Sequence, residues 1–116
     1  MQVTMEHTTK KISMFKSAPA IRLDVQFTEV EKTAIERSGL ARFEFYTPPI
    51  HSHYEAEYQR PWRIAHLLNP KATHIVFQDQ ATARIEDPKI RQGLKNVKAA
   101  IEENSAPVPI KDTFEL

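Results

Sequence analysis

Apolar residues recur at helical spacing near the end of the chain, and this is its clearest pattern. In the segment 87–104, Ile90, Leu94, Val97 and Ile101 follow one another at intervals of four, three and four residues. This is the period of one face of a helix. Asp87 is a suitable N-cap and Pro88 is suited to the first helical position, so the pattern predicts a helix over 87–104. Gly93, which disfavours a helix interior, indicates the close approach of another backbone.

Alternating apolar and polar residues predict strands elsewhere. The clearest alternation is at 21–27, where Ile21, Leu23, Val25 and Phe27 share one face. A strand with one buried and one wet face is typical of an antiparallel sheet. Weaker patterns predict strands over 10–16, 41–46, 62–68 and 73–78, with a turn at 17–20.

Local signals place a second, shorter helix between two of these strands. Thr28 and Glu31 have the spacing of a capping box, and Gly39 is a suitable left-handed terminator for a helix ending near Ser38. The segment 79–86 allows two readings, an extra helical turn capped by Asp79 or a continued strand. We predict an α+β fold, a mostly antiparallel sheet with two helices on one face. If the C-terminal tail is a strand, the order approximates a ferredoxin-like split βαβ arrangement. Residues 1–9 are expected to be a flexible start, and 10–116 a single domain.

Composition narrows the classes of function. The chain of 116 residues has no cysteine, two glycines and a net charge of +1. Thiol chemistry and glycine-rich phosphate loops are therefore excluded, and no overall charge draws the chain to nucleic acid. No segment has the length of apolar residues that spans a membrane. We expect a soluble, cytoplasmic protein that does not bind membranes and has no cofactor.

A proline-bounded segment, 47–63, favours a protein-interaction module without catalytic activity. It combines aromatic and arginine side chains, the types that dominate interface hot spots. The predicted partner-binding residues are Tyr54, Tyr58, Arg60, Trp62 and Arg63. An exposed edge strand would also invite pairing with a partner protein or a second copy of the chain.

The same segment contains an alternative pattern, which indicates a metal-binding protein or a small metal-dependent enzyme. His51, His53 and Glu57 combine imidazoles with a carboxylate, a ligand set suited to a divalent metal such as Zn. The spacing H-x-H-x-x-x-E resembles the first metal motif of the cupin family, in which these residue types hold a metal inside a barrel. The glycines that flank that motif are missing, as is the second cupin motif, so we do not assign the chain to the cupins. The other reading is a solvated loop with local charge pairing.

A second alternative is nucleic-acid binding. Arg91, Lys95 and Lys98 form a basic ridge beside the apolar stripe of the C-terminal helix. Such a ridge can pair with phosphates, although lysine and arginine are also common on the wet face of a surface helix.

Overall fold

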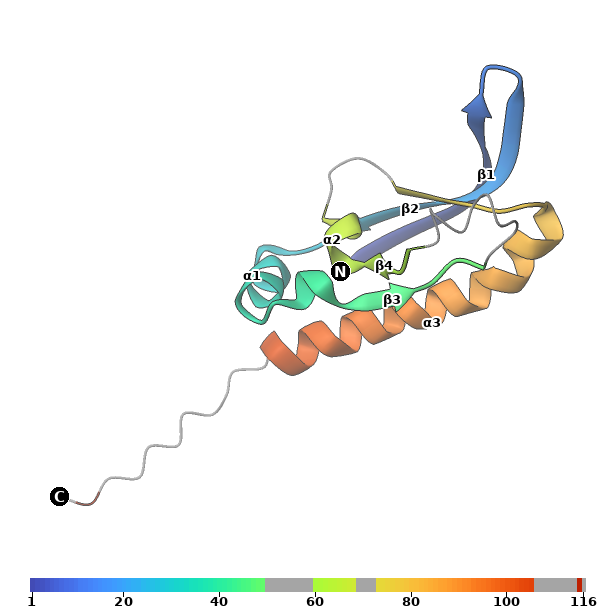
Figure 1. The fold of residues 1–116 in the computed structure, drawn as a ribbon. Coiled ribbons are helices and arrows are strands. Elements are labelled where there is room, and N and C mark those ends of the chain that lie inside the picture. The colour runs from blue at the N-terminus through green and yellow to red at the C-terminus, as the bar shows by residue number, and fades with distance from the viewer. Residues whose placement is uncertain (50–59, 69–72, 106–114, 116) are drawn as a thin grey trace.

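The fold is that of a computed structural model, which describes residues 1–49, 60–68, 73–105 and 115. Across these residues an antiparallel sheet combines with three helices, one more than the sequence predicted (Figure 1). The predicted α+β class is confirmed. The elements in chain order are β1 (Gln2–Ser13), β2 (Lys16–Gln26), α1 (Glu29–Arg37), the 3-10 turn η1 (Leu40–Arg42), β3 (Glu44–Tyr46), β4 (Trp62–Arg63), α2 (Ile64–Leu67), β5 (Thr73–Val76) and α3 (Gln80–Ser105).

The main sheet has the order β1-β2-β5, and each neighbouring pair is antiparallel. Ile21 and Leu23 of β2 are fully buried on the face predicted for them, opposite Ile75 and Thr73 of β5. β3 and β4 form a separate two-stranded ladder. The split βαβ arrangement stays a prediction, because most of the tail that would supply its last strand lies outside the described residues.

The first residues differ from the flexible start that the sequence suggested, because β1 covers Gln2–Ser13. Each residue from Gln2 to Lys11 lies opposite a residue of β2, with Val3 facing Val25 and Met5 facing Leu23. These apolar pairs stabilise the ladder across the strands, and their partners are distant in sequence. A polar strand that depends on such pairs has little local signal of its own.

The turn predicted at 17–20 is also wrong, since β2 runs through these residues and the chain reverses at Met14 and Phe15. Pro19 fits within the strand because of its position. Its carbonyl oxygen accepts a hydrogen bond from the Phe77 amide at 2.8 Å, so its backbone faces away from β1. The missing N–H of this proline therefore removes no hydrogen bond between β1 and β2.

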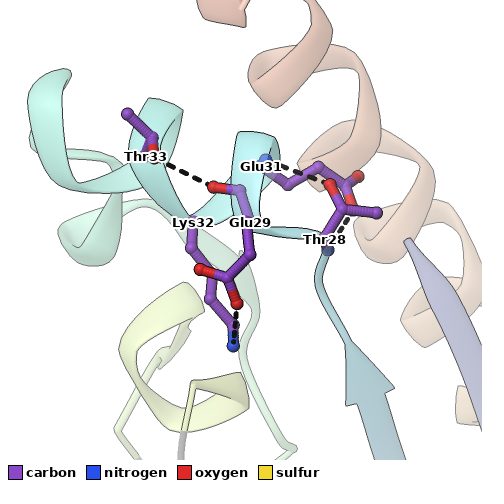
Figure 2. Close-up of polar contacts among 5 residues, drawn as sticks. All are labelled: Thr28, Glu29, Glu31, Lys32 and Thr33. Carbon is purple, nitrogen blue, oxygen red and sulfur yellow. Dashed lines mark hydrogen bonds and ion pairs between the residues drawn. The ribbon is translucent and has the colours of Figure 1, made fainter.

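Helix α1 begins with the predicted capping box (Figure 2). The Glu31 amide donates to the Thr28 hydroxyl at 3.1 Å, and the Thr28 amide donates to the Glu31 carboxylate at 2.8 Å. Two free amides of the first turn are thereby satisfied. Gly39 follows the helix with φ of 65°, the left-handed conformation predicted for it.

Replacing Thr28 by alanine is expected to lower the free energy of unfolding by about 1 kcal/mol, because the N-cap acceptor is lost. Thr33→Ala is the matched control. The Thr33 hydroxyl donates only to the Glu29 carbonyl inside the same helix (Figure 2), and alanine is the better helix former at that position. Urea denaturation of both variants measures the difference. An equal loss for the two variants would contradict the capping role.

The strand predicted over 62–68 is wrong beyond its first two residues, because α2 occupies Ile64–Leu67. The Arg63 amide donates to Nδ1 of His66 at 2.9 Å and so starts the helical turn. Ile64 and Leu67 are both buried, three residues apart on one helical face. The strand predicted over 41–46 is shorter too, with η1 before β3.

Helix α3 begins seven residues earlier than the pattern predicted and covers 26 residues. Asp79 caps it, since the Thr82 amide donates to the Asp79 carboxylate at 2.7 Å. The helical reading of 79–86 is therefore correct. Pro88 lies inside the helix rather than at its start, and the helix bends in its first turns (Figure 1), as expected when a proline removes an internal hydrogen bond.

The predicted apolar stripe of α3 is confirmed, and it forms one core with the sheet and α1. Ile90, Val97 and Ile101 are at most 1% exposed. Gly93 lies against the backbone of Phe45 in β3, so the predicted close approach is also confirmed. No helix within the described ranges is both long and apolar enough to cross a membrane.

Candidate functional site

The partner-binding residues predicted from the segment 47–63 are only partly visible. Tyr54 and Tyr58 lie outside the described residues. Arg60 and Arg63 are exposed, while Trp62 is half-buried and packs against the core. The Trp62 and His66 rings lie 5.0 Å apart between centroids, and the Arg63 guanidinium is 3.4 Å from the Glu44 carboxylate. Trp62 thus anchors this segment, and the two arginines flank it.

The predicted metal ligands His51, His53 and Glu57 also lie outside the described residues. Within the part of the chain that the structure describes, no group of three or more histidine and acidic side chains is placed to hold a metal. Zinc binding by these three residues stays a prediction.

The basic ridge of α3 faces the first strand of the sheet. Arg91, Lys95 and Lys98 are exposed, and together with Leu94 they line a groove whose other wall is Met1 and Val3. The groove has a volume of about 410 Å³. Arg91 is 2.6 Å from the Asp87 carboxylate and Lys98 is 3.9 Å from Glu102. The ridge predicted as a phosphate-binding surface is therefore also the cationic rim of an apolar groove.

β1 is attached to α3 by a polar contact that the sequence did not suggest. His7 Nε2 lies 2.6 Å from the Asp87 carboxylate, which also accepts from Arg91 Nε. Burial opposes the charged carboxylate, but the hydrogen bonds from His7 and Arg91 prevail and hold the pKa of Asp87 below its usual value. Asp87 was predicted to cap the helix. It instead holds the strand and the helix together.

The tip of the β1–β2 hairpin is the most exposed apolar feature of the described chain. Phe15 is 95% exposed, Met14 76% and Ile12 48%. β5 ends at Val76, opposite Ala20, so the end of the hairpin projects beyond it (Figure 1). The tip also carries Lys10, Lys11 and Lys16, and no acidic residue lies between Glu6 and Asp24.

Sequence reasoning missed this tip because the pattern over 10–16 predicts only a weak strand. One sequence signal points to the tip. Met14 and Phe15 are adjacent large apolar residues close to lysines, whereas an alternating strand would have a polar side chain at one of the two positions. The exposed tip becomes recognisable only when the hairpin is seen to extend past its neighbouring strand.

Glu86 and Tyr46 form a buried polar pair between α3 and β3. Glu86 is 5% exposed, accepts from the Tyr46 hydroxyl at 2.9 Å and lies 2.8 Å from Lys89 Nζ. The pKa of the Tyr46 hydroxyl lies far above its usual value. Burial is the largest cause, and the hydrogen bond to Glu86 and the charge of Glu86 add to it. The tyrosine stays protonated and donates, so the pair connects the two elements.

Comparisons of the chain with models of protein families, with curated proteins and with solved structures find no match.

Proposed function

We propose that this protein is a small non-catalytic interaction module that binds a partner protein, with the hairpin tip as its anchor. The observation that carries the proposal is the exposure of Phe15, Met14 and Ile12 at the end of a projecting two-stranded ribbon. Exposed apolar side chains that lie together mark interaction sites more often than scattered ones do.

The tip has the composition of an interface anchor. An aromatic side chain with neighbouring apolar residues contributes most when it enters a pocket of the partner. Burying a side chain of the size of Phe15 is worth about 1.5–3 kcal/mol. The tip carries Lys10, Lys11 and Lys16, and the sequence around them contains no acidic residue. Their charge favours a pocket with an acidic rim, which would increase the rate of association and its specificity.

The predicted class of function, a protein-interaction module, is unchanged, and the hairpin tip is added to its candidate binding surfaces. Arg60, Trp62 and Arg63 remain candidates for the same role, and for Tyr54 and Tyr58 the role is a prediction from the sequence alone. A cytoplasmic location likewise remains a prediction from the sequence.

A photo-crosslinking amino acid at position 15 tests the proposal in the cells that make the protein. We expect one protein to crosslink at position 15 and not at position 30, where Val30 is 69% exposed on α1. In a direct binding assay with that partner, Phe15→Ala should weaken the affinity at least tenfold. Val30→Ala should leave it unchanged.

The melting temperature separates binding from folding. Phe15→Ala should change it by less than about 2 °C, because so exposed a side chain contributes little to the core. A large loss of stability, or identical crosslinks at positions 15 and 30, would contradict the proposal.

A further inference from the structure

We propose that the outer edge of β1 accepts an acidic, extended segment of the partner protein as an additional strand of the sheet. This inference rests on the proposed function, which supplies the partner protein. It adds that a second, acidic segment of that partner binds at the β1 edge. Four observations carry it: the direction of the free backbone groups, the regularity of the edge, the apolar groove beside it and the charge of α3.

The hydrogen bonds of β2 determine which backbone groups of β1 point away from β2. The Pro19 carbonyl oxygen accepts from the Phe77 amide, and the Leu23 carbonyl oxygen accepts from the Thr73 hydroxyl, both on the β5 side. Backbone groups of successive residues alternate between the two sides of a strand, so even-numbered residues of β2 face β1. The residues of β1 that lie opposite these even-numbered residues form hydrogen bonds with β2. The backbone groups of the remaining β1 residues face outward. The outward residues are Val3, Met5, His7 and Thr9.

This edge is long and regular. β1 covers twelve residues, none of them proline, and its register with β2 is unbroken from Gln2 to Lys11. Within the described residues, β2 is the only strand paired with β1. Natural proteins usually shorten, bend or cover such an edge, because its free N–H and C=O groups pair readily with another chain.

The groove lies beside this edge. The backbone amide and carbonyl of Val3 face outward, and Val3 also lines the groove. The His7 side chain contacts Asp87 on α3. Side chains of an added strand that lie opposite these residues would point to the same face of the sheet. They would meet the apolar side chains of Val3 and Leu94, with Arg91, Lys95 and Lys98 lining the same groove.

The charge of the rim selects the occupant. A second copy of the chain paired through β1 would bring the two sets of Arg91, Lys95 and Lys98 toward each other, which like charges disfavour. An acidic segment would instead gain attraction from the same cations. Lys95 has no acidic partner among the described residues, and the pair between Lys98 and Glu102 is 3.9 Å long.

A nine-residue peptide with Glu and Val in turn at its odd positions and Thr at its even positions serves as the probe, because its odd side chains share one face. The same peptide with Lys in place of Glu is its control. We expect the acidic peptide to bind at least tenfold more tightly, measured by NMR titration at about 0.1 M salt. Lys95→Glu with Lys98→Glu should reverse the preference. Bound peptide should slow amide hydrogen exchange at Val3, Met5, His7 and Thr9.

Thr9→Pro, with Thr9→Val as the matched control, tests the edge itself. The Thr9 amide faces outward, so proline removes a donor to the added strand without removing one to β2. We expect the proline variant alone to lose peptide binding. The inference would be overturned if the two peptides bound equally, or if the acidic peptide did not bind at about 1 mM. It would also be overturned by a β1-dependent dimer in sedimentation or by binding of a DNA duplex instead of the peptide. The effect of Phe15→Ala on partner binding is independent, so the proposed function can stand if this inference fails.

Discussion

Replacing Gly93 by alanine is expected to lower the free energy of unfolding by about 2 kcal/mol, and the melting temperature by about 10 °C. An added Cβ would overlap the carbonyl oxygen of Phe45 and lie 3.0 Å from its carbonyl carbon. Backbone atoms cannot rotate away as a flexible side chain can, so α3 must separate from β3. Alanine would favour the helix by about 1 kcal/mol, and the clash must exceed that gain for the variant to be less stable.

Gly39→Ala is the control for a glycine replaced without a clash. Nothing lies within 4 Å of an added Cβ at Gly39, and the expected loss of about 1 kcal/mol comes only from its left-handed backbone. Thermal and urea unfolding of both variants give the comparison. A Gly93→Ala protein as stable as the parent would show that α3 and β3 are not in contact at this point.

Replacing Glu86 by alanine is expected to lower the free energy of unfolding by about 2 kcal/mol as well. The change leaves the buried Tyr46 hydroxyl without its acceptor, and a buried polar group without a partner costs about 1–3 kcal/mol. Glu86→Gln should lose less, because its amide oxygen can still accept from Tyr46.

A double-mutant cycle with Tyr46→Phe isolates the contact between the two side chains. We expect the double variant to be more stable than the sum of the two single losses predicts, with a coupling of about 1 kcal/mol, since neither change leaves an orphaned group once both are made. Purely additive losses would show that the hydrogen bond contributes nothing beyond packing.

Local sequence signals predicted the parts of the fold that depend on neighbours in the chain. The stripe of Ile90, Leu94, Val97 and Ile101, the Thr28–Glu31 capping box and the left-handed Gly39 are of this kind, and all are confirmed. Gly93 was predictable because a glycine in an otherwise regular helix needs a reason.

The misassigned segments depend on contacts between distant residues. β1 forms against β2, and its polar sequence has little periodicity of its own. The position of Pro88 predicts the start of a helix, but capping by Asp79 and burial of Ala83 extend the helix before it. At 62–68, alternation and helical spacing both fit the apolar residues, and the hydrogen bond to His66 decides for the helix.

The place of the candidate site in the fold could not be predicted from the sequence, and its protein-interaction role stays a prediction. The sequence suggested a protein interaction and an exposed edge strand, and it identified the basic ridge. It could not show that Val3 and Lys95 line one groove, nor that Phe15 projects from the body, because both result from how β1 and β2 pair.

Amide hydrogen exchange of the free protein tests the central claim, that β1 is an ordered strand with an open outer edge. Thr4, Glu6 and Thr8 should exchange slowly, because their amides bond to β2, and Val3, Met5, His7 and Thr9 should exchange rapidly. This alternation would support both the hairpin and its free edge. Rapid exchange at all seven residues would contradict the strand, and slow exchange at all seven would show that the edge is already covered.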